Sequence, residues 1–249
     1  MEDKELKKIC QTISGYPEVI QKEIYNQLKI KFEDSTFKEI QKLFKSRLQD
    51  IAKDLDYPED TICVLSGEEQ RLASEYPDTY QSITTVHHRD ARTSFQYAMD
   101  LAASWIMEDY IINQLKIKGL SIERAGEDKE RKMLSSKKIS SNSDCKVLLN
   151  GQEIPLELVN DYKGYWAKNK KIDLRDDKYL NMVKKKSLLL GISTKDQKYI
   201  LLNFAKDIKA KHIENHYAYH KPAYSIPITP DMLKDLDFSA IAEVIAKEL

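Results

Sequence analysis

The sequence predicts an α/β protein with a mixed β-sheet flanked by helices and an N-terminal helical subdomain. Three observations lead to this fold class. Apolar residues recur every three or four positions up to about residue 56, which indicates amphipathic helices. A long helix is expected over 90–116, ended by Gly119. Beyond Gly119, short apolar runs are separated by turns, which is typical of strands alternating with helices.

The helical subdomain is expected to span about 1–66, and the α/β core 67–249. The stretch 58–77 is expected to be irregular. Asn150-Gly151 predicts a two-residue hairpin turn between strands over 146–149 and 154–159. The remaining expected elements are strands over 120–124, 188–192 and 199–202, helices over 173–186, 204–220 and 237–249, and a proline-limited edge segment over 224–228.

Composition excludes several classes of protein. The chain has 249 residues, with 40 Lys and Arg against 40 Asp and Glu, so its formal net charge is zero. Three scattered cysteines offer neither a disulfide framework nor a zinc knuckle. Neither a signal peptide nor a bilayer-spanning apolar run is recognisable, so we expect a soluble, cytoplasmic protein. P-loop, dinucleotide-binding and nucleophile-elbow motifs are also missing from the sequence.

Charge is unevenly distributed along the chain. Residues 129–186 contain 15 Lys and Arg but only 8 Asp and Glu, a local excess of +7. Such a segment indicates an anionic ligand, most commonly nucleic acid, or else a set of solvated helix faces.

Two acidic residues in the predicted hairpin are candidates for metal binding. Asp144 opens the first strand, and Glu157 lies among apolar residues of the second. Because the strands are antiparallel, both carboxylates are expected near the same end of the sheet, where a divalent cation would relieve their repulsion. Oxygen ligands favour Mg²⁺ over Zn²⁺.

The order of these features resembles the PD-(D/E)XK nuclease superfamily, and most closely the type II restriction endonucleases, over about residues 90–205. A long helix precedes a strand and the acid-bearing hairpin, and a basic, aromatic stretch and a helix–strand pair follow. The resemblance implies that Asp144 and Glu157 hold Mg²⁺ against the scissile phosphate. It also implies that Glu108, on the long helix, is a further metal ligand.

One position departs from the motif. If Glu157 is its acidic member, Val159 stands where the lysine is expected; a register shifted by two places Pro155 where an acid is expected. Lys146 and Lys163 are the two candidate substitutes, and the sequence does not choose between them.

Further residues are candidates for contact with DNA because aromatic and cationic side chains alternate beside the acidic strand. These residues are Tyr162, Lys163, Tyr165, Trp166, Lys168, Lys170, Lys171 and Arg175. His212, His216 and His220 recur every four residues, which on a helix would stack three imidazoles along one face. Three histidines so placed can chelate a transition metal, but the segment has neither an HExxH motif nor a nearby cysteine.

The expected function is therefore that of a Mg²⁺-dependent, sequence-specific endonuclease acting on double-stranded DNA. The resemblance implies a homodimer and a cognate DNA methyltransferase in the same system. Two alternatives stay open: a DNA repair or resolvase nuclease, and a non-catalytic DNA-binding protein with a degenerate nuclease fold.

Overall fold

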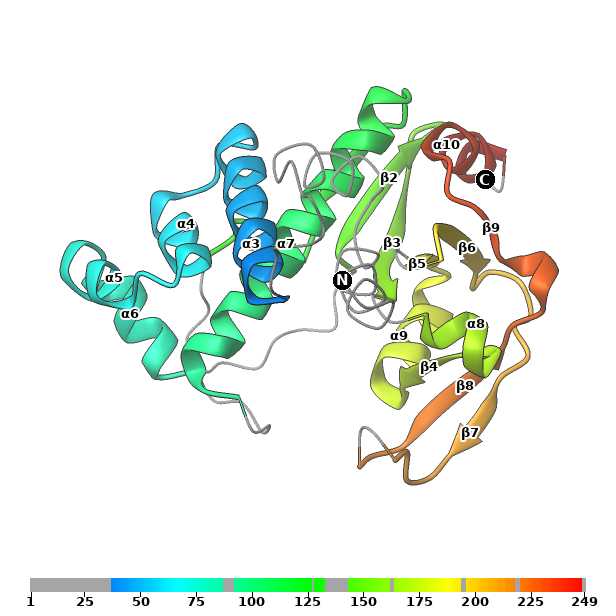
Figure 1. Ribbon diagram of the computed structural model, residues 1–249. Helices are drawn as coiled ribbons and strands as arrows, with labels where there is room; N and C mark the ends of the chain where they lie inside the picture. Colours follow the sequence, from blue (N-terminus) through cyan, green and yellow to red (C-terminus); the bar gives the residue numbers. More distant parts are fainter. Residues whose placement is uncertain are drawn as a thin grey trace. The chain divides into compact units, whose positions relative to one another are not determined.

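The computed structural model describes residues 37–86, 92–126, 128–132, 143–161, 164–193, 196–217 and 220–247. The chain divides into two compact units (Figure 1). The described part of the helical unit is 37–86, 92–111 and 128–132, and the described remainder forms the α/β unit. Of the helices in these ranges, none combines the length and the apolar character needed to cross a membrane.

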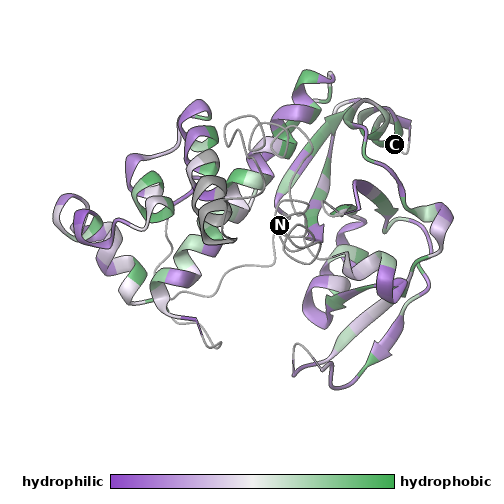
Figure 2. Cartoon of the chain, in the orientation of Figure 1, coloured by the Kyte–Doolittle hydropathy of each residue, from purple (hydrophilic) through white to green (hydrophobic). Residues whose placement is uncertain are grey.

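The helical unit contains α3 (Phe37–Asp54), α4 (Glu59–Ser66), α5 (Glu69–Glu75), α6 (Pro77–Thr84) and most of α7 (Ser94–Ile117). The long helix predicted over 90–116 is confirmed as α7. The irregular stretch predicted over 58–77 is wrong, because α4 and α5 occupy it. Gly67 ends α4 in the left-handed conformation, with a φ of 70°, and α5 begins two residues later. Figure 2 shows hydrophilic and hydrophobic bands along these helices.

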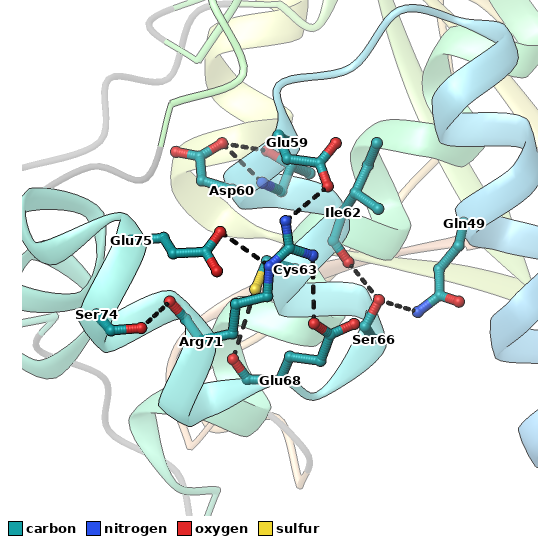
Figure 3. Close-up of polar contacts among 11 residues, drawn as sticks. Gln49, Glu59, Asp60, Ile62, Cys63, Ser66, Glu68, Arg71, Ser74 and Glu75 are labelled. Carbon is teal, nitrogen blue, oxygen red and sulfur yellow. Dashed lines mark hydrogen bonds and ion pairs between the residues drawn. The ribbon is translucent and has the colours of Figure 1, made fainter.

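Arg71 joins α4 and α5 through three carboxylates. Its guanidinium lies 3.2 Å from Glu59, 3.3 Å from Glu68 and 2.9 Å from Glu75. Figure 3 shows how the three carboxylates surround it. The side chain is 37% exposed, so this is a solvent-screened network and a modest source of stability.

The α/β unit is built on a six-stranded mixed sheet, in the order β1-β2-β3-β5-β6-β9. Strands β3 and β5 are parallel, and the other neighbours are antiparallel. The strand bounds are β1 Ile122–Arg124, β2 Cys145–Leu149, β3 Gln152–Asp161, β5 Leu188–Ser193, β6 Lys198–Asn203 and β9 Lys234–Asp235. The predicted α/β class with a mixed sheet and flanking helices is thus confirmed.

The predicted hairpin is also confirmed. Residues Cys145 and Leu156 are paired across β2 and β3. The turn residues Asn150 and Gly151 both have positive φ, 50° and 78°, as a hairpin turn matched to the strand twist requires.

A second sheet was not anticipated. It has the order β4-β8-β7, with bounds Lys171–Arg175, Ala223–Pro227 and Lys211–Ile213. The helix predicted over 204–220 is therefore wrong, since β7 lies within it. The edge segment predicted over 224–228 is likewise wrong, since β8 is the central strand. Pro227 is the last residue of β8, so its missing N–H costs little.

Three elements cover one face of the large sheet: α8 (Tyr165–Asn169), β4 and α9 (Asp176–Lys185). The core that they form includes Trp166 of α8, Met182 of α9, and Leu189 and Ile200 of the sheet. The 3₁₀ turn Pro230–Met232 leads to β9, and α10 (Phe238–Lys247) confirms the predicted C-terminal helix.

Candidate active site

Asp144 and Glu157 lie side by side because of the hairpin register. Cys145 pairs with Leu156, so the preceding Asp144 stands opposite Glu157. The Leu158 N–H donates to Asp144 Oδ2 at 2.8 Å, which fixes the Asp144 carboxylate beside β3. Asp144 is close enough for its negative charge to act on Glu157. The expectation that the hairpin brings these two acids together is confirmed.

Lys178 is the cation of this site. Its Nζ lies 2.7 Å from Glu157 Oε2, and the Glu157 side chain is only 4% exposed. Lys178 belongs to the first turn of α9, which covers the same face of the sheet that carries Glu157. Asp144, Glu157 and Lys178 are called the carboxylate–lysine cluster below.

Burial is the main influence on the charge of Glu157. It raises the pKa of this carboxyl to about 7, assisted by the negative charge of Asp144 and opposed by Lys178. For Lys178, burial acts to lower the pKa, but the charges of Asp144 and Glu157 outweigh it and raise the pKa. The lysine therefore stays protonated, while Glu157 changes its charge near neutral pH.

The cluster is suited to a hard divalent cation. Among the residues that the structure describes, no three His, Cys, Asp or Glu side chains are arranged to hold a metal ion. Mg²⁺ does not require three, since it is commonly held by one or two carboxylates together with waters and substrate phosphate oxygens. A cation would also oppose the repulsion that raises the pKa of Glu157. The donor set therefore fits Mg²⁺.

The two lysines considered from the sequence are placed differently. Lys146 lies on β2 opposite Pro155, and its Nζ is 2.6 Å from Glu153 and 3.9 Å from Glu123. Lys146 therefore forms ion pairs near the hairpin turn. The lysine that contacts Glu157 is Lys178. Lys163 lies outside the described residues.

Glu108 has a buried cation as its partner. Its Oε2 lies 3.0 Å from the Arg131 guanidinium, which is itself 2.9 Å from Asp109. Arg131 and Asp109 are almost fully buried, and Tyr57 donates its hydroxyl hydrogen to Asp109. Among the residues that the structure describes, Glu108 is therefore part of an ion-pair network with Arg131 and Asp109 in the helical unit.

The candidate DNA-contacting residues divide into four groups. Tyr162 lies outside the described residues, as Lys163 does. Trp166 is a core residue, 4% exposed, so its ring does not form the outer surface expected of it. Tyr165 and Lys171 both contact Asp173. The exposed residues are Lys168, Lys170 and Arg175.

The three histidines do not share a helix. His212 lies on β7, 3.5 Å from Asp176 and 3.3 Å from Glu214. His216 is buried, with Nε2 3.0 Å from Asp173 Oδ2. His220 has a positive φ of 51° in the turn before β8. The stacked arrangement that a helix would have given is therefore wrong.

Lys178 was missed as a site residue because it stands 21 positions after Glu157, on a separate element. One signal pointed toward it. Lys178 and the buried Met182 are four residues apart, so the lysine shares the inward face of its helix.

Comparison with known proteins gives no family for the chain. No protein-family model matches the sequence, and neither does any curated protein.

Proposed function

We propose that the protein is a Mg²⁺-dependent nuclease that hydrolyses phosphodiester bonds in double-stranded DNA. The observation that carries the proposal is the carboxylate–lysine cluster: two adjoining carboxylates and a lysine held 2.7 Å from one of them. The order of elements along the chain supports it. The long helix α7 precedes the antiparallel strands β1, β2 and β3, and after α8 and β4 come the helix α9 and the strand β5, which is parallel to β3. This is the order expected from the resemblance to PD-(D/E)XK nucleases.

Each residue has a distinct role in the proposed reaction. Asp144 and Glu157 supply oxygen ligands, and bound Mg²⁺ supplies polarisation of the phosphoryl oxygen and a lower pKa for water. Lys178 orients the attacking water and stabilises the negative charge that develops on the phosphoryl oxygens. The water oxygen forms the new P–O bond and loses one proton to solvent. The bond to the leaving sugar oxygen breaks, and that oxygen takes up a proton from solvent.

Lys178 also bears on the choice between a nuclease and a non-catalytic DNA-binding protein. The missing motif lysine is the sequence feature that favours a degenerate site. Lys178, on α9, contacts Glu157 and so supplies the positive charge that the missing motif lysine would have supplied. This favours the catalytic alternative.

The direct test is incubation of the purified chain with unmethylated phage DNA, with and without Mg²⁺. We expect Mg²⁺-dependent cleavage; discrete fragments would identify a site-specific restriction enzyme, and structure-dependent cutting of branched DNA a resolvase. Lys178→Ala should lower the cleavage rate by about 10²–10³-fold, as removal of one preorganised charge does. Lys184→Ala, an exposed lysine of the same helix, is the matched control and should cleave normally. Equal activity of the two variants would contradict the assignment of Lys178.

Asp144→Ala and Glu157→Ala should abolish cleavage but not DNA binding. Each removes a metal ligand, and each also removes a negative charge that repels phosphate. Binding measured without metal should therefore be unchanged or tighter. Loss of binding together with loss of folding, seen in a thermal melt, would instead indicate a structural role for the carboxylate.

The resemblance also leads us to propose a homodimer, in which each subunit cuts one strand of a palindromic site. Sedimentation of the chain with and without DNA tests this.

A further inference from the structure

A cavity of about 500 Å³ lies beside α8, within the α/β unit. Its lining comes from α8, from the turn and first residue of β6, and from the segment 228–233, which joins β8 to β9. Cavities of this size hold drug-sized organic ligands. No residue of the carboxylate–lysine cluster lines it, so the cavity is separate from the candidate active site.

Apolar side chains form most of the lining. Trp166 and Ile228 are core residues, 4% and 5% exposed, and they form the floor. Ala167, Pro230 and Leu233 are more accessible and form the walls. Removing such apolar surface from water is favourable, so the cavity favours a ligand with an apolar body.

Backbone hydrogen bonds hold the walls in place. The Lys170 N–H donates to the Trp166 carbonyl at 2.7 Å, and the Ile228 N–H donates to the Lys170 carbonyl at 2.9 Å, which ties α8 to the residue after β8. The Leu236 N–H donates to the Gln197 carbonyl at 2.9 Å, which ties the end of β9 to the turn before β6. The cavity is therefore preformed, and a ligand needs to order little of the chain in order to bind.

The charge that the lining offers to a ligand is positive. Lys170, Lys198 and Asp196 are its charged members, and Asp196 Oδ2 accepts from the Ser193 hydroxyl at 2.9 Å. Lys198 is paired with Asp235, whose side chain is 91% exposed, so solvent weakens this pair and an anion can compete for the lysine. Lys170 is exposed, and among the described residues its ammonium group has no ion-pair partner.

We propose that this cavity binds a small organic acid that combines an apolar body with one anionic group. The apolar body packs against Ala167, Pro230 and Leu233, and the anionic group accepts a hydrogen bond from the Lys170 ammonium. The proposal goes beyond the proposed function and does not depend on it, because the lining includes neither the two carboxylates nor Lys178.

The test measures binding of octanoate and 2-naphthoate to the full chain by isothermal titration calorimetry, in the absence of DNA. Octan-1-ol and 2-naphthalenemethanol are neutral probes with the same apolar bodies, and acetate is an anion that lacks one. We expect at least one acid to bind about tenfold more tightly than its alcohol, the value of one charged hydrogen bond, and acetate not to bind at millimolar concentration. Failure of both acids to bind, or alcohols or acetate that bind as tightly as the acids, would overturn the proposal.

A charge variant assigns the anionic group to Lys170. Lys170→Gln should weaken binding of the acid about tenfold and leave binding of the alcohol unchanged. Lys168→Gln is the matched control, since this exposed lysine belongs to the same helix but does not line the cavity. Equal weakening in the two variants would mean that the general surface charge attracts the acid, which would refute the site.

A second variant fills the cavity. Ala167 is exposed on α8 and lines the cavity, so the ring of Ala167→Phe should occupy the space without disturbing the core. We expect binding of the acid to be lost while the melting temperature stays the same. Unchanged binding in both Ala167→Phe and Lys170→Gln would place the ligand elsewhere and refute the proposal.

Discussion

Glu157 combines two properties that a purely structural carboxylate rarely has. It is buried in a sheet, and its closest neighbours are another carboxylate and a lysine. A buried salt bridge alone would keep Glu157 ionised, but here burial and Asp144 prevail and raise its pKa to about 7. Under the proposed function, binding of Mg²⁺ would therefore displace a proton from Glu157.

Stability in EDTA should consequently fall as the pH rises. The folded state holds a proton on Glu157 up to a pKa of about 7, whereas the unfolded chain releases it near 4.5. The stabilising effect is thus complete below pH 4.5 and is lost as the pH rises toward 7, amounting to about 3 kcal/mol. Chemical denaturation across this range measures it, and Glu157→Gln should abolish this part of the slope.

Mg²⁺ should reverse this trend, because the ion competes with the proton for Glu157. The increase in melting temperature caused by Mg²⁺ should be small at pH 5 and grow as the pH passes about 7. A Mg²⁺ effect that does not depend on pH would contradict a site at Glu157.

The Arg131 network gives a contrasting prediction for Glu108. Arg131→Met leaves Asp109 as a buried charge without its cation and should cost about 3–5 kcal/mol of folding stability. Glu108→Gln should leave the Mg²⁺-dependent rise in melting temperature unchanged, since Glu108 contacts Arg131. A smaller Mg²⁺-dependent rise in melting temperature in Glu108→Gln would instead indicate that Glu108 is a metal ligand.

For individual residues, the sequence predicts which side chains lie together within one hairpin, but it does not predict which side chains approach them from other elements. Asp144 and Glu157 could be paired because Asn150-Gly151 determines the register between them. Lys178 could not, since its position depends on how α9 packs over the sheet.

At the scale of the elements, β5 packs closely against α8 because residue 191 is a glycine. A Cβ at Gly191 would lie 2.7 Å from Trp166 Cη2 and 2.8 Å from Ile200 Cγ2, too close for either. Gly191→Ala should therefore cost about 1–3 kcal/mol through overpacking. Denaturant melts of Gly191→Ala, Trp166→Phe and the double variant should show that the smaller ring recovers part of the loss. Purely additive effects would contradict a clash between these two residues.

Elements with a clear periodicity were predictable, and those without one were not. The helix α7 and the β2–β3 hairpin have long apolar patterns or a specific turn. The segment around β7 has neither, and the spacing of its histidines suggested a helix. Its strand conformation comes from pairing with β8, a contact that depends on tertiary structure: His212 opposes Tyr224, and their rings lie 4.9 Å apart.

For the molecule as a whole, the neutral net charge conceals a basic segment from 129 to 186. Part of its positive charge is neutralised within the fold: Lys146, Lys171 and Lys178 each lie within 3 Å of a carboxylate. Charges available to an external polyanion therefore come from the exposed members of the segment.

Exposed lysines should accordingly set the salt dependence of DNA binding. Replacing Lys168 and Lys170 with Gln should weaken binding, and should reduce the slope of log K against log salt by about 0.9 for each DNA phosphate that the protein no longer neutralises. The control replaces Lys209 and Lys234, which are also exposed but lie outside the basic segment, with the same change in net charge. Affinity is measured by fluorescence anisotropy in Ca²⁺, so that cleavage does not interfere. If both double variants shift the slope equally, net charge alone attracts the DNA; a shift confined to the first places the phosphate backbone over α8.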